Sequence, residues 1–64
     1  MQALLAQYSN LALGLKSTVV EGMEPSPDTY EVIFSDTDAD LLISRRIGIK
    51  SLAEARRYAR SLVA

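Results

Sequence analysis

The stretch from Thr29 to Ile47, TYEVIFSDTDADLLISRRI, decides the fold because it predicts a β-hairpin. Its first seven residues alternate between two faces, as in a half-buried strand. One face holds Tyr30, Val32 and Phe34. The segment from Asp36 to Ala39 is typical of a turn, since aspartate side chains bond the local backbone. Leu41 to Ile47 is then predicted to return as the next strand.

The same alternation predicts how the two strands pair. Apolar residues share a face when Ser35 pairs with Asp40, and a slip of one residue would turn them to opposite faces. This register sets Phe34 opposite Leu41, Val32 opposite Ile43, Tyr30 opposite Arg45 and Glu31 opposite Ser44. On the outer face it sets Ile33 opposite Leu42. That apolar pair is either ordinary surface scatter or the middle of a self-association surface.

The N-terminal segment, residues 1–15, is predicted to be an amphipathic helix, because its apolar residues recur at i, i+3, i+4 and i+7. Gly14 would form the C-cap of this helix. The opposite face carries no charge, so it is either solvated by amide side chains or covered by another subunit. After it, the β-branched segment Ser17–Glu21 predicts a strand. Residues 23–28, which include both prolines, predict a connection.

The C-terminal segment predicts a second helix with a defined start. Ser51 and Glu54 form a capping-box pattern, in which the serine hydroxyl accepts a hydrogen bond from an early amide. Ile49, just before the cap, is expected to pack on the helix and fix its direction. The apolar face of this helix holds Leu52, Ala55, Tyr58, Ala59, Leu62 and Val63.

These elements predict a single small α+β domain over residues 1–64 with the order α-β-β-β-α. An antiparallel three-stranded sheet would carry both helices on its Tyr30/Val32/Phe34 face. The expected core consists of Leu4, Leu11, Leu15, Val32, Phe34, Leu41, Ile43, Ala55, Ala59 and Leu62.

Charge is sorted along the chain. Residues 1–44 contain one basic residue against seven acidic ones, whereas residues 45–64 contain six basic residues against one, Glu54. A net charge of −1 therefore conceals a basic C-terminal third, which can face an anion, a nucleic acid or an acidic partner. The candidate residues are Arg45, Arg46, Lys50, Arg56, Arg57 and Arg60. Without a ligand, Arg45 and Arg46 would neutralise Glu21 and Glu31, and the helix arginines would be solvated.

The sequence predicts no catalytic, cofactor-binding or metal-binding residue, and we do not expect an enzyme. The chain has no cysteine or histidine, which excludes disulfides and a Cys/His zinc site. Asp36, Asp38 and Asp40 resemble the start of a calcium loop, but Leu41 and Ile47 occupy the positions that need glycine and glutamate. No glycine-rich phosphate loop is present. No apolar run is long enough to cross a bilayer, and we expect a cytoplasmic protein.

The predicted order helix, three strands, helix resembles that of the double-stranded-RNA-binding domain. Gly48, Lys50, Ser51 and Ala55 resemble the glycine–lysine–alanine pattern at the start of that family's last helix. Leu52 and Ala53 replace the lysines that the family has after the serine. The resemblance implies nucleic-acid binding through the basic third.

Two function classes follow from these patterns. The first is a non-catalytic interaction or accessory module, expected to be a homodimer and to bind a protein partner that the sequence does not identify. Ile33 and Leu42 are its candidate self-association residues. The alternative is a nucleic-acid-binding protein that uses the six basic residues. The net charge and the lack of exposed aromatic residues for base stacking weigh against the alternative.

Overall fold

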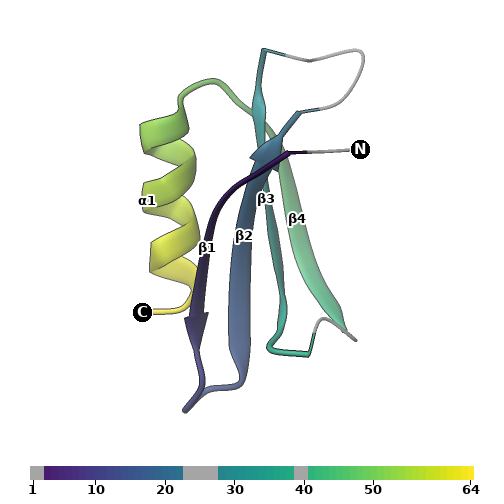
Figure 1. The fold of residues 1–64 in the computed structure, drawn as a ribbon, viewed down its shortest axis with the longest axis vertical. Coiled ribbons are helices and arrows are strands. Elements are labelled where there is room, and N and C mark those ends of the chain that lie inside the picture. Colours follow the sequence, from purple (N-terminus) through teal and green to yellow (C-terminus); the bar gives the residue numbers. More distant parts are fainter. Residues whose placement is uncertain (1–2, 23–27, 39–40) are drawn as a thin grey trace.

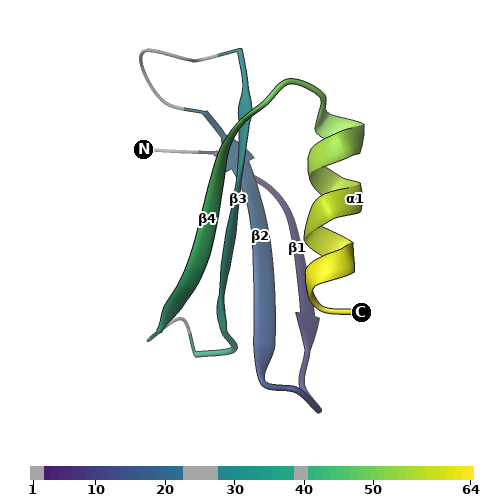
Figure 2. The ribbon, with the colours of Figure 1, turned by 180° about the vertical axis from the view of Figure 1, so that it is seen from behind.

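The computed structural model describes residues 3–22, 28–38 and 41–64. Four antiparallel strands follow one another in a meander of order β1-β2-β3-β4, and a helix packs on one face of the sheet (Figure 1). The elements are β1 (Leu4–Asn10), β2 (Leu15–Glu21), β3 (Tyr30–Asp36), β4 (Leu42–Ile49) and α1 (Leu52–Leu62). Both ribbon views place β4 farthest from α1 (Figures 1 and 2).

The predicted α+β class is confirmed, but the predicted architecture is wrong. The sheet has four strands instead of three, and the described residues contain one helix instead of two. The three expected strands correspond to β2, β3 and β4, and the expected C-terminal helix is α1. The α-β-β-β-α order shared with the double-stranded-RNA-binding domain is therefore absent.

The error lies in residues 1–15, whose described part forms β1 and the first hairpin turn. β1 pairs with β2, and Asn10 lies opposite Leu15. The Asn10 side-chain oxygen closes the turn by accepting a hydrogen bond from the Leu13 N–H at 3.2 Å. Gly14 has a φ of 69°, so it occupies a left-handed position in a hairpin turn instead of ending a helix.

The predicted register of the second hairpin is also wrong. In the structure, Phe34 lies opposite Ser44, Val32 opposite Arg46, Ile33 opposite Arg45, Ser35 opposite Leu42 and Tyr30 opposite Ile49. Two irregularities interrupt this pairing, one between Tyr30 and Val32 and one between Phe34 and Ser35. Gly48 lies at the first of these and has a φ of 76°. A bulge adds an unpaired residue, so a strict alternation cannot give the pairing beyond it. The predicted Ser35–Asp40 pair and most of the proline-containing connection lie outside the described residues.

The core lies between the sheet and α1. The buried cluster comprises Val19, Val32, Ile49, Ala55 and Ala59, each no more than 3% exposed. Of the predicted core, Val32, Ala55 and Ala59 are buried, Leu62 packs against the cluster, and Leu15 and Phe34 are half-buried. The prediction is wrong for Leu4, Leu11, Leu41 and Ile43, which are 47–83% exposed. The first two were predicted to face the core from a helix, and the others followed the wrong register.

Polar contacts fix both ends of α1. Ser51 caps its N-terminus, as predicted, by accepting a hydrogen bond from the Glu54 N–H at 3.3 Å. The Ser17 hydroxyl donates to the Ala59 carbonyl at 2.6 Å, and the Asn10 amide donates to the Val63 carbonyl at 2.8 Å. The last carbonyls of a helix lack intrahelical donors, and here side chains from β1 and β2 donate the hydrogen bonds at the C-terminal end of α1.

The expected packing of Ile49 against the helix is confirmed, since it is 3% exposed and belongs to the core cluster with Ala55. Small residues at positions 55 and 59 let the helix backbone approach the sheet closely enough for Ser17 to reach a helix carbonyl. The helix thus covers one face of the sheet, mainly over β2 and β3. Among the described residues no helix or strand packs on the other face, where Val20, Glu31 and Ser35 are buried in the centre of the sheet.

Candidate functional site

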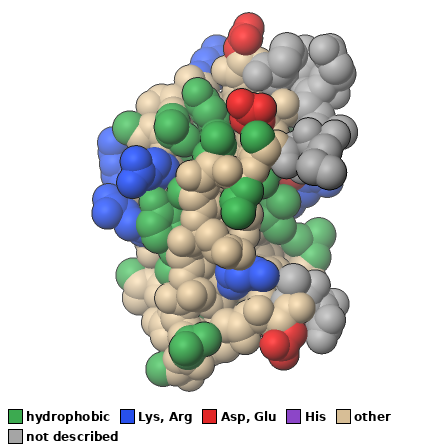
Figure 3. Space-filling view, viewed as in Figure 1, with side chains coloured by type: hydrophobic (Ala, Val, Ile, Leu, Met, Phe, Trp, Pro, Cys, Tyr) green, Lys and Arg blue, Asp and Glu red, His purple; other side chains and the backbone are tan. Residues whose placement is uncertain are grey.

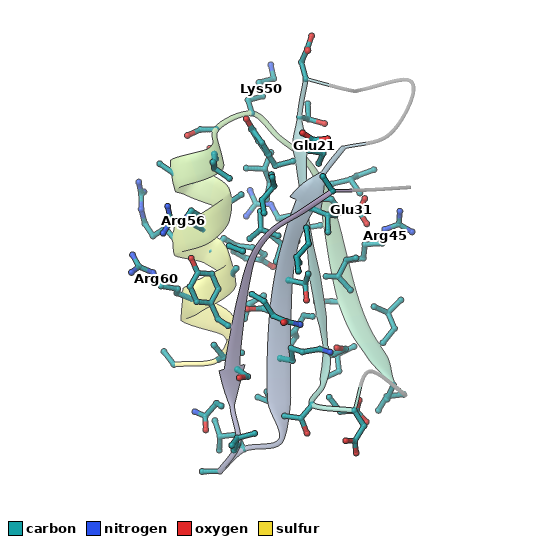
Figure 4. All side chains as sticks on the ribbon, in the orientation of Figure 1. Glu21, Glu31, Arg45, Lys50, Arg56 and Arg60 are labelled. Atoms are coloured by element: carbon teal, nitrogen blue, oxygen red, sulfur yellow. The ribbon has the colours of Figure 1, made fainter. Side chains whose placement is uncertain are left out.

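The structure divides the six candidate basic residues between two sides of the molecule. Arg45 lies on the sheet face that α1 does not cover, whereas Arg56 and Arg60 project from the far side of α1 (Figure 4). Arg46 follows Arg45 on an extended strand and therefore faces the helix. The guanidinium of Arg46 stands over the Tyr58 ring, 4.7 Å from its centroid. The six residues do not form one surface.

Arg45 forms an ion pair with Glu31, whose side chain is only 3% exposed. The hydrogen bond to Glu31 and the charge of its carboxylate raise the pKa of Arg45 above its usual value. The predicted neutralisation is therefore confirmed for Arg45. Arg46 contacts an aromatic ring, and its neutralisation of Glu21 stays a prediction. Arg45 is engaged within the chain and is a weak candidate for an external anion.

A hydrogen bond between a guanidinium and a hydroxyl group joins α1 to β1. Arg56 donates from Nε to the Tyr8 hydroxyl at 3.1 Å, and this hydrogen bond raises the pKa of Arg56. Lys50, Arg57 and Arg60 make no side-chain hydrogen bond or ion pair within the described part of the chain. Tyr8 thus restrains one guanidinium while its two neighbours remain exposed.

An open hollow of about 320 Å³ lies on the outer side of α1, lined by Ala53, Arg56, Arg57 and Arg60; we call it the arginine hollow. These positions are i, i+3, i+4 and i+7, so they share one helix face. The small side chain of Ala53 leaves the space that the three guanidiniums surround. Figure 3 shows one group of blue side chains on the α1 side of the surface, while other blue side chains lie apart from it.

The sheet face opposite α1, which we call the open face, contains both predicted self-association residues. Ile33 pairs with Arg45 and Leu42 pairs with Ser35, so the two are near neighbours on one face and not a directly opposed pair. Ile33 is half-buried and Leu42 is 57% exposed. Leu4, paired with Val20 on the same face, is 61% exposed, and Ile47 on β4 is 69% exposed.

A second apolar area lies where two hairpin turns meet. The Thr37 N–H donates to the Gly14 carbonyl at 3.0 Å and joins the β1–β2 turn to the β3–β4 turn. Leu11, Leu13 and Leu41 at these turns are 83%, 59% and 62% exposed. This end of the sheet is the natural comparison for the open face in any test of association.

The described residues offer no metal centre, since they contain no group of three acidic side chains that could hold an ion. Within the same residues, no helix combines the length and apolarity needed to cross a bilayer.

Sequence analysis did not identify three residues that contribute to these surfaces: Ala53, Tyr58 and Tyr8. Ala53 could have been found, because its spacing to the three arginines is that of a single helix face. The Arg46–Tyr58 and Arg56–Tyr8 contacts join residues 12 and 48 positions apart, and the second needs β1, which was predicted to be a helix. No local sequence signal reports such pairings.

Comparison with known proteins finds no matching protein-family model, no matching curated protein and no matching solved structure. The open face and the arginine hollow are therefore the two surfaces from which a function can be proposed.

Proposed function

We propose that this protein is a non-catalytic interaction module that self-associates by placing the open faces of two copies against each other. The proposal rests on the observation that α1 packs on one face of the sheet only, among the described elements. α1 buries one face, while the other keeps Leu42 and Ile47 at 57% and 69% exposure on β4. The proposed compartment is the cytoplasm, since a chain without cysteine needs no oxidising environment.

A second copy suits this face because its charges are largely satisfied within the chain. The ion pair of Glu31 with Arg45 leaves Lys16 as the other formal charge among the described residues of the face. Two such faces related by a two-fold axis present the same apolar residues to each other, which is the requirement for a closed dimer. Sheets stacked in this way lie about 10 Å apart.

The edge of β4 is less suited to extending the sheet. Two irregularities interrupt its pairing with β3, and Arg45 and Arg46 stand in its middle. Bulges and charged residues are the devices that protect edge strands from pairing with other chains. The geometry therefore favours contact through the face over contact through the strand edge.

The size of the open face sets the expected strength of the dimer. Four strands of seven or eight residues give a face of roughly 19 by 23 Å, from strand spacing and rise. Its area lies below the roughly 800 Å² per partner of a standard interface. We therefore expect weak association, visible at several hundred micromolar and insensitive to salt because the contact is apolar.

Sedimentation equilibrium tests the proposal with matched variants. The parent chain is expected to approach the dimer mass as its concentration rises. Leu42→Lys should remain a monomer, because burial of an unpaired ammonium opposes association. Leu11→Lys makes the same change at an 83% exposed turn position outside the open face and should behave like the parent. A parent that stays monomeric, or a dimer that only Leu11→Lys dissociates, would refute the proposal.

A further inference from the structure

We propose that the arginine hollow on α1 is a binding site for the phosphate group of a small ligand. This site is separate from the open face, because Arg56 and Arg60 project from the opposite side of the molecule to Arg45 (Figure 4). The inference therefore stands independently of self-association.

The first argument is the local excess of positive charge. Arg56, Arg57 and Arg60 line one hollow, and like charges at i, i+3 and i+4 destabilise a helix. The single acidic residue of α1, Glu54, forms no ion pair within the described residues. The negative end of the helix dipole stabilises a cation in the last turn, which accounts for Arg60. Arg56 and Arg57 lie further from that end, so the dipole does not account for them. An anion in the hollow would relieve this repulsion.

The second argument is preorganisation. The Tyr8 hydroxyl accepts from Nε of Arg56 at 3.1 Å and so restrains the direction of that guanidinium. The terminal nitrogens of Arg56 are still available as donors, since a guanidinium carries five N–H groups. A site with one restrained arginine loses less side-chain entropy on binding than a site of three mobile ones.

The donor set favours phosphate over a single carboxylate. Guanidinium groups match phosphate oxygens with two parallel hydrogen bonds, and three of them around one space suit an anion with several oxygens and up to two charges. A carboxylate would form two hydrogen bonds with one guanidinium and leave the other two guanidiniums without a partner. Ala53 lines the hollow with a small side chain and adds no competing polar group.

The distribution of the other basic residues favours a small ligand over a nucleic-acid strand. Arg45 is paired with Glu31 on the open face and Arg46 stands over Tyr58, so the basic residues form no continuous track. The hollow of about 320 Å³ is open to solvent and has space for a phosphate group. We therefore assign the hollow to one phosphate group and the part of the ligand next to it.

The test is a titration of the isotopically labelled chain with inorganic phosphate, phenyl phosphate and acetate at constant ionic strength, followed by NMR. Saturable shifts are expected with both phosphates at the α1 amides between positions 53 and 60 and at the arginine Nε–H groups. Acetate should produce no saturable shift. Arg57→Ala should weaken phosphate binding about tenfold, the worth of one hydrogen bond to a charged group.

The matched control is Lys50→Ala, which removes the same charge from an exposed residue outside the hollow. Its phosphate affinity should equal that of the parent. Equal weakening by Lys50→Ala and Arg57→Ala would mean non-specific charge attraction and would overturn the proposal. Tighter binding of an oligonucleotide or an acidic peptide, with shifts that extend to Lys50 and Arg46, would also overturn it in favour of a macromolecular surface.

Tyr8→Phe separates positioning from charge. It removes the hydroxyl that holds Arg56 and keeps the ring, so the thermal unfolding midpoint should change little. Phosphate affinity should fall two- to fivefold by loss of preorganisation, and the Nε–H signal of Arg56 should shift in the free protein. If phosphate affinity is unchanged while the Arg56 signal moves, Tyr8 is not a positioning residue for this site.

Discussion

The two faces of the sheet differ in what contacts them. On the covered face, Val19, Val32 and the buried hydroxyl of Ser17 meet the small residues of α1, and the contact includes a hydrogen bond to the helix backbone. On the open face, Leu42 and Ile47 remain exposed and the main internal contact is the ion pair of Arg45 with Glu31. The covered face therefore stabilises the monomer, whereas the open face is the surface that we propose for self-association.

The largest expected effect is on the covered face. Val32→Ala removes two methyl groups from a side chain that is 1% exposed and should lower the free energy of unfolding by about 2–3 kcal/mol. Urea denaturation measures this loss. The control is Leu42→Ala on the open face, measured in dilute protein, which should cost about 0.5 kcal/mol or less. If both variants lost the same free energy of unfolding, the covered face would not stabilise the monomer more than the open face does.

Next in size is the hydrogen bond that joins the covered face to the helix end. Ser17→Ala leaves the buried Ala59 carbonyl without its donor and should cost about 1–2 kcal/mol. Ser9→Ala removes an exposed hydroxyl from β1 and is expected to change little. Hydrogen exchange should locate the Ser17→Ala effect in the last turn of α1. A loss spread evenly over the sheet would contradict the capping role.

A smaller loss is expected on the open face from Arg45→Ala. The change removes the ion-pair partner of a carboxylate whose side chain is 3% exposed, although water can replace a partner that is itself 52% exposed. The urea midpoint should fall less than for Ser17→Ala. Adding Glu31→Gln should recover part of the loss, because the buried charge is then absent. No recovery in the double variant would mean that the pair does not carry the effect.

The smallest expected effect is in the arginine hollow. Arg57→Ala removes an exposed cation without a partner among the described residues, so the free energy of unfolding should change by no more than about 0.5 kcal/mol. The substitution should raise the free energy of unfolding slightly, because it decreases like-charge repulsion on α1. Thermal unfolding at low and high salt measures it. A clear destabilisation would show that Arg57 is structural.

How far the sequence predicts the structure depends on how local the signals are. The Ser51 cap, the position of Ile49 and the extent of α1 follow from adjacent residues, and all are present. Residues 4–10 have apolar spacing that fits a helix, but their pairing with β2 determines their structure. The predicted helix lacked charge on its outer face, which is unusual for a surface helix; in the structure Ala6 and Tyr8 of β1 pack against the core cluster.

The candidate surfaces were predictable only in part. Ile33 and Leu42 do share the open face, but the bulges in β4 changed which residues they lie opposite. The basic residues were identified by charge alone, whereas alternation along β4 could have assigned Arg45 and Arg46 to opposite faces. The contacts of Tyr8 and Tyr58 depend on the tertiary fold and could not be predicted.

The most direct test of the account is an isotope-filtered NOE experiment on a mixture of labelled and unlabelled chains at high concentration. The open-face proposal predicts intermolecular NOEs among the methyl groups of Ile33, Leu42 and Ile47, and none from Leu11 or Leu13 at the hairpin turn. Intermolecular NOEs confined to the turn leucines, or none at a concentration of several hundred micromolar, would contradict it.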